Sequence, residues 1–206
     1  MQHLFRRAAV AVVLFDLRAA EALLKLPDAE LGRLFKISLA RVMGVATVLN
    51  LDRRSVRGQG AQLSSKIKRR AVRRMSPRKA LVAEGKLLRA EILCDAWGIT
   101  EQRLNKRVSA GRVFSVEVEA EQYYPAFFLA NELDRKDLAK VVRRLDGLTG
   151  WSKWRFFTEP MEPLGGLTPL QAILRGDVKR VLRTAKAAAK QSQKLEKGNT
   201  LGTKRS

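Results

Sequence analysis

The chain has 206 residues, 46% hydrophobic and 30% charged, which is enough to bury a core in one domain or in two small ones. Its 41 lysines and arginines against 20 acidic residues leave a formal charge of +21, and such a field favours a polyanionic partner. A single cysteine, Cys94, and a single histidine, His3, exclude a disulfide framework and leave little for metal or acid–base chemistry.

The residue types and the hydropathy of the chain favour neither catalysis nor membrane insertion. We expect no catalytic residue, no metal and no cofactor, and predict that the chain is not an enzyme. The longest apolar run, residues 8–15, is far shorter than the roughly 20 residues that a spanning helix needs. Charged Asp16 and Arg18 follow it at once, and no convincing signal-peptide cleavage site is visible. The sequence therefore predicts a cytoplasmic protein without membrane contact.

The first region, residues 1–52, reads as helical. Residues 4–24 are expected to pair as a helical hairpin with a second helix, which has Asp28 as its N-cap and Asn50 at its end. Apolar residues recur along this second helix at helical spacing: Leu31, Leu34, Phe35, Ile37, Leu39, Val42, Val45 and Val48. Whether this region forms a homodimer is left open by the sequence.

A strongly basic linker and helix is predicted at residues 53–75. Gly58 and Gly60 indicate that it begins as a loop, and the part after them has helical character. Clustered cations next to a DNA-reading element are expected to contact phosphates. The candidates are Lys66, Lys68, Arg69, Arg70, Arg73 and Arg74.

Residues 76–109 have the layout of a helix-turn-helix. Ser76 and Pro77 begin a short helix that stops at Gly85, and a second helix is expected over about 89–97. Gly98 makes the tight turn, and Thr100 caps a third helix at 101–109. This order predicts a second, polar helix presented to the major groove of DNA.

The outer face of the helix at 101–109 carries side chains suited to base edges. Leu104 and Val108 fall together and are expected to face the core. Arginine and lysine pair with guanine, and asparagine and glutamine pair with adenine. The predicted DNA-binding residues here are Gln102, Arg103, Asn105, Lys106 and Ser109. The alternative interpretation is an ordinary solvated helix face in a basic protein.

A short β-hairpin is predicted at residues 113–127. Apolar Phe114, Val116 and Val118 alternate with polar residues up to a turn near Ala120, which is the period-2 pattern of a half-buried strand. The outer face is acidic and phosphates would repel it, so we interpret the hairpin as a packing brace rather than a wing that touches DNA. The aromatic residues that follow are interpreted as core rather than as a base-stacking platform: Tyr123, Tyr124, Phe127 and Phe128.

Beyond a helix expected at 134–145, residues 150–187 contain a tryptophan-rich helix followed by "PLGGLTPLQAILRGDVKRV". This segment resembles the toxin-binding domain of the Xre/MbcA/ParS antitoxin family. The matching residues are Trp151, Trp154, Pro163, Leu164, Gly165, Gly166, Thr168, Pro169, Leu170, Gly176 and Val181. Gly165 and Gly166 allow a tight turn, Thr168 and Pro169 open the next helix, and Leu170, Ile173 and Leu174 are expected to bury its inner face.

The resemblance implies both a partner and a type of regulation. Family members pair a helix-turn-helix with this domain, hold a cognate toxin inactive, often of the RES type acting on NAD, and repress their own operon. The implied partner-binding residues are Trp154, Leu164, Gly165, Gly166, Thr168 and Pro169.

The sequence thus predicts a mainly α fold: a helix-turn-helix core, one short β-hairpin and a small C-terminal helical domain. The expected segments are 1–52, 53–75, 76–128, 129–187 and a disordered basic tail at 188–206. The expected function is sequence-specific binding of double-stranded DNA by a transcriptional regulator of antitoxin type. A non-specific nucleic-acid binder, associated with the nucleoid or with RNA, is the alternative, and the charge alone supports it equally well.

Overall fold

The computed structural model describes residue 23, residues 25–51 and residues 76–202, with side chains placed as far as 192. It divides into two compact units, Met1–Leu39 and Ala40–Ser206. The helical hairpin expected for 4–24 and the basic segment 53–75 fall almost wholly outside the described residues. Within the described part of the chain, no helix combines the length and apolar character required to cross a membrane.

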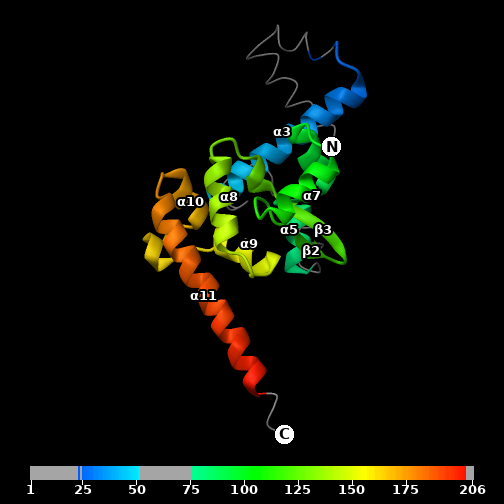
Figure 1. Ribbon diagram of the computed structural model, residues 1–206. Helices are drawn as coiled ribbons and strands as arrows, with labels where there is room; N and C mark the ends of the chain where they lie inside the picture. The colour runs from blue at the N-terminus through cyan, green and yellow to red at the C-terminus, as the bar shows by residue number, and fades with distance from the viewer. Residues whose placement is uncertain (1–22, 24, 52–75, 203–206) are drawn as a thin grey trace. The chain divides into compact units, whose positions relative to one another are not determined.

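The described chain is mostly helical, as predicted, with one small antiparallel sheet (Figure 1). The long helix α3 (Asp28–Val48) ends before Asn50, which has a positive φ of 53°. The elements that follow are α5 (Pro77–Ala83), β1 (Leu87–Leu88), α6 (Ala90–Trp97), α7 (Glu101–Ser109), β2 (Val116–Val118), β3 (Glu121–Pro125), η1 (Ala126–Leu129), α8 (Arg135–Arg144), α9 (Gly150–Thr158), η2 (Glu162–Leu164), α10 (Pro169–Leu174) and α11 (Val178–Gly202).

The predicted hairpin is formed by β2 and β3, and a third strand extends it. Val116 pairs with Tyr123, and the two-residue loop at Glu119 and Ala120 has positive φ at both positions, which is typical of a type I′ turn. The two-residue strand β1 pairs with β3, giving the strand order β1-β3-β2. Leu87 and Leu88 are too short a run to show strand periodicity, so no signal in the sequence indicates β1.

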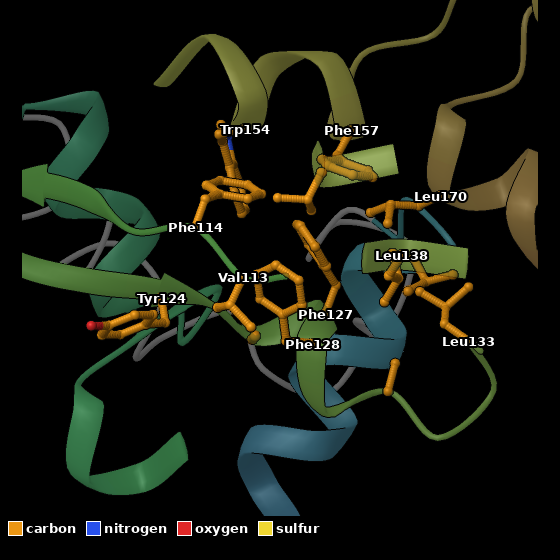
Figure 2. Close-up of a cluster of buried hydrophobic side chains, with 14 of the residues drawn as sticks. Val113, Phe114, Tyr124, Phe127, Phe128, Leu133, Leu138, Trp154, Phe157 and Leu170 are labelled. Carbon is orange, nitrogen blue, oxygen red and sulfur yellow. The ribbon is translucent and has the colours of Figure 1, made fainter. Parts of the chain in front are cut away.

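An aromatic cluster lies at the centre of the Ala40–Ser206 unit (Figure 2). Phe127, which is fully buried, has its ring centroid 6.2 Å from that of Phe114, 5.3 Å from that of Phe157 and 6.0 Å from that of Trp154. The four rings come from the start of the hairpin, from η1 and from α9. Tyr123, Tyr124, Phe127 and Phe128 are all buried, which confirms their interpretation as core residues.

One hydrophobic cluster includes residues of both the helix-turn-helix and the C-terminal segment. It extends from Ala40 through Leu93 and Leu104 to Val181 and Ala185. The division expected between residues 128 and 129 falls inside η1, whose side chains are buried. The helix-turn-helix and residues 150–187 therefore share one core instead of forming separately packed domains.

The C-terminal end differs from the prediction of a disordered tail at 188–206, because α11 continues to Gly202. Residues 185–190 consist only of alanine and lysine, both strong helix formers, so local propensity extends the helix despite low hydrophobicity.

Helix α3 does not bury all of the apolar residues that the sequence places along it. Ile37 and Val48 are buried, whereas Leu39 and Val42 are 50% and 62% exposed, so the helix carries apolar residues on more than one face.

At Gly44, α3 packs directly against the backbone of η1. A Cβ atom added there would collide with the carbonyl oxygen of Ala126, and it would lie 3.1 Å from the carbonyl carbon. Backbone atoms at this contact have no rotamer through which to move away. The small residue is thus required for the helix to pack at this distance.

We predict that Gly44→Ala lowers the free energy of unfolding by about 1–3 kcal/mol, because overpacking a rigid contact forces backbone shifts. Gly32→Ala, in the same helix, is the matched control: no heavy atom of the described residues lies within 4 Å of a Cβ there. That substitution is expected to stabilise by up to about 1 kcal/mol through helix propensity. Urea denaturation of both variants measures the difference, and equal effects would contradict the close packing.

Candidate nucleic-acid interface

The helix-turn-helix forms where the sequence predicted it. Gly98 ends α6 in the left-handed region with a φ of 60°, and the amide of Ile99 donates to the carbonyl of Cys94 at 3.0 Å. The Thr100 side chain then accepts a hydrogen bond from the amide of Arg103 and caps α7. These local interactions fix the direction in which α7 leaves the turn.

Two fully buried leucines hold the two helices together and orient α7. Leu93 of α6 and Leu104 of α7 have no exposed area, and Val108 packs against the same core. All five residues predicted to read bases are exposed on the other side of α7: Gln102, Arg103, Asn105, Lys106 and Ser109. The face is available to a duplex, although a solvated helix face would have the same exposure. The residues predicted to contact phosphates, Lys66, Lys68, Arg69, Arg70, Arg73 and Arg74, lie outside the described residues.

Two of the three acidic residues of the hairpin bind cations of the same chain. Glu119 forms an ion pair with Lys79 of α5, and Glu121 forms one with Arg89 at 2.9 Å. The backbone carbonyl of Glu117 accepts a hydrogen bond from the indole of Trp151 at 3.0 Å. The hairpin follows the helix-turn-helix in the position of a wing. Its charges are nevertheless used within the fold, in agreement with the interpretation of the hairpin as a brace.

The turn and the helix start predicted within residues 163–174 both form. Gly165 and Gly166 both have a positive φ, of 70° and 75°. Thr168 and Gln171 form a reciprocal capping box that begins α10, and the side-chain amide nitrogen of Gln171 also donates to the carbonyl of Leu49. Leu170 and Ile173 are buried as expected, whereas Leu174 is 37% exposed because it is the last residue of this short helix.

Most of the partner-binding residues implied by the resemblance are internal. Trp154, Leu164, Thr168 and Pro169 are buried, and the Trp154 ring stacks on Phe127. Their side chains serve packing and capping in this conformation and do not form a surface. Of the six implied residues, Gly165 and Gly166 are the ones exposed to solvent.

A group of cations around Trp97 was not identified from the sequence. The guanidinium carbons of Arg107 and Arg135 lie 4.9 and 5.3 Å from the Trp97 ring centroid. Burial lowers the pKa of Arg135, and the neighbouring charges of Arg107 and Arg41 lower it further. All three disfavour the charged form of the Arg135 guanidinium. Only tertiary contacts bring these residues together. The one available sequence signal is the basic spacing of α8, with Lys136, Lys140 and Arg143 three or four residues apart.

Comparison of the chain with protein-family models, with curated proteins and with solved structures gives no match. The functional interpretation therefore depends on the geometry and chemistry of the described residues.

The hydroxyl of Tyr123 donates to Glu121 at 2.7 Å, and this hydrogen bond, with burial, raises the pKa of Tyr123. Burial also raises the pKa of Tyr124. Because its pKa is raised on folding, Tyr123 contributes to the free energy of unfolding. That contribution is fully present below the ordinary tyrosine pKa, and it is lost as pH rises through the higher pKa of Tyr123 in the folded protein.

We predict that Glu121→Ala shifts one of two tyrosinate transitions to lower pH, since the acceptor and its negative charge are removed. Ultraviolet absorbance during a pH titration measures both transitions, and Tyr123→Phe assigns them. Glu117→Ala removes another exposed hairpin carboxylate and is expected to leave the curve unchanged. An unaltered titration in Glu121→Ala would show that the hairpin contact is absent in solution.

Proposed function

We propose that the chain is a sequence-specific double-stranded DNA-binding protein that regulates transcription, built like an antitoxin. The observation that carries this proposal is the polar face of α7. Five side chains able to hydrogen-bond base edges are exposed together on a helix whose opposite face is fixed by buried Leu104. The net charge of +21 supplies the attraction to a polyanion that such binding requires.

In this proposal α7 lies in the major groove, and four of its exposed side chains have defined roles. Arg103 and Lys106 donate to guanine, whereas Gln102 and Asn105 form paired hydrogen bonds with adenine. Thr100 and Gly98 act indirectly by fixing the start of the helix. The hairpin takes no part in base reading, because phosphates repel its carboxylates and two of these, Glu119 and Glu121, already pair with Lys79 and Arg89.

Non-specific binding of DNA or RNA is the alternative function, and the overall charge favours it. It differs from the first proposal in one measurable respect. Phosphate contacts weaken binding to every sequence alike when they are removed, whereas base contacts discriminate by roughly 1–3 kcal/mol each.

The first test replaces the base-reading side chains one at a time after a preferred duplex has been selected from a random pool. Gln102→Ala, Asn105→Ala and Lys106→Ala are each expected to weaken binding to the selected duplex while scarcely changing binding to a scrambled one. Titrations at one fixed salt concentration provide the affinities. Asn131→Ala and Lys179→Ala, at exposed positions outside α7, are the matched controls and should not discriminate between the duplexes.

Two results would favour the non-specific alternative. One is a pool that yields no enriched sequence. The other is an equal loss of affinity on both duplexes for the three α7 variants, which would make α7 a solvated face.

The second test concerns the basic segment that precedes α5. Replacing Arg69, Arg70, Arg73 and Arg74 by alanine is expected to weaken binding to all duplexes equally. The slope of log K against log salt should flatten by about 0.9 for each phosphate that the variant no longer neutralises. A salt titration of the fourfold variant with a scrambled duplex measures this slope, and an unchanged slope would remove these residues from the interface.

A cognate toxin is the partner that the antitoxin resemblance supports. In the described conformation, contact with it would centre on the exposed turn at Gly165 and Gly166 and not on the buried Trp154. The turn is attached to α11 by a hydrogen bond from Arg180 to the carbonyl of Pro163 at 2.9 Å. The resemblance of residues 150–187 to the antitoxin family is the sole support for a toxin partner.

A further inference from the structure

Two arginines converge on one tryptophan at the C-terminal end of α7. Arg107 belongs to the last turn of α7, Arg135 begins α8, and both contact the ring of Trp97, the last residue of α6. The indole nitrogen of Trp97 is buried and has no hydrogen-bond acceptor among the described residues. Stacking on an aromatic ring restrains a guanidinium and leaves its edge N–H groups available for oxygen ligands.

A cavity of about 510 Å³ opens beside this group, and its charged lining is entirely basic. Buried Val113, Phe128 and Leu138 contribute to its apolar walls. The cations that line it are Arg107, Arg112, Arg135, Lys136, Lys140 and Arg143.

Few of these charges are balanced within the fold. Among the described residues, Lys140 alone of the six forms an ion pair, with Asp137 at 2.8 Å. Burial is the main cause of the lowered pKa of Arg135, and repulsion by Arg107 and Arg41 lowers it further. Cations held together with few counter-charges are stabilised when an anion binds, so this cavity favours an anionic ligand.

A second hollow continues the basic surface along α8 towards α11. It shares Lys140 and Arg143 with the first, and it adds Arg144, Lys186 and Lys190, with Asp146 as its one acidic lining residue. The basic surface thus extends over more than one anion-binding position. An extended ligand with repeated negative charges matches this layout better than a single small anion does.

We propose that the Arg107–Trp97–Arg135 group and the adjoining cations of α8 bind backbone phosphates of duplex DNA beside the segment that α7 reads. This inference rests on the proposed DNA binding. Arg107 lies four residues after Arg103, so one face of α7 leads from the base-reading side chains to the cavity. Phosphate contacts at this place position α7 in the groove without reading sequence.

The experiment measures the salt dependence of full-chain binding to a scrambled duplex, so that it does not require a selected site. Arg135→Gln and Lys136→Gln are combined in one variant. If both side chains contact phosphates, the slope of log K against log salt flattens by about 1.8, at about 0.9 for each contact. Arg175→Gln combined with Lys179→Gln removes the same charge from exposed positions outside both hollows, and its slope should equal that of the wild type.

Each outcome of this experiment has a definite meaning. An unchanged slope in the Arg135/Lys136 variant, or an equal change in the control variant, overturns the proposal. Thermal unfolding of both variants checks that the fold is retained, and Lys136→Gln alone, at an exposed position, should still flatten the slope by about 0.9.

Two further results separate this inference from its alternatives. If ATP, used as a small phosphate-bearing probe, binds the wild type with saturation and loses affinity in the Arg135/Lys136 variant while the DNA slope is unchanged, the cavity is a small-anion site and the proposal fails. If selection yields no preferred duplex but the slope flattens as expected, sequence-specific reading by α7 fails and the phosphate contacts stand.

Discussion

The packing of Phe127 against Phe114, Phe157 and Trp154 is the interaction on which the rest of the structure depends. These rings join the start of the hairpin, η1 and α9 in one buried cluster. Each aromatic pair contributes about 0.5–1.5 kcal/mol beyond the area that it buries. Because Leu93 and Leu104 belong to the same continuous core, α7 is held by contacts that extend to the C-terminal segment. The helix-turn-helix is therefore not free to reorient on a flexible linker relative to α9 and α10.

The distribution of charge follows from this shared core. Hairpin carboxylates pair with Lys79 and Arg89, so acidic residues are neutralised where the hairpin packs against neighbouring elements. Around Trp97 and along α8, five of the six cations that line the first cavity have no ion pair among the described residues. In the proposed function, cations gathered at one cavity would help to orient an approaching polyanion as well as to attract it.

The sequence predicted structure correctly where the interacting residues are close in the chain. Gly98 and Thr100 are examples: a left-handed C-cap and a side-chain N-cap depend on residues only a few positions apart, so α6 and α7 form where expected. Features that depend on contacts between distant residues could not be predicted in this way. Trp154 lies in a matching motif, but its burial depends on Phe127, 27 residues earlier. The convergence of two arginines on Trp97 has no counterpart in sequence spacing, because three different helices supply the residues. The candidate base contacts could be predicted from one helix face, whereas the phosphate site proposed beside Trp97 could be inferred only from the fold.

Helix α8 packs one face into the core and presents cations on the other, where the proposed phosphate contacts lie. Leu138, Val141 and Val142 are buried against the core, whereas Lys136 and Lys140 are exposed on the basic side. An amphipathic helix of this kind allows its outer charges to change without altering its inner packing. Arg143 is the exception, since its side chain packs near Gly111 and its Nε donates to the carbonyl of Ala139. Loss of Arg143 would combine a packing defect with a charge defect. Lys136, with its exposed side chain, is consequently the position at which an effect on polyanion binding can be separated most cleanly from an effect on folding.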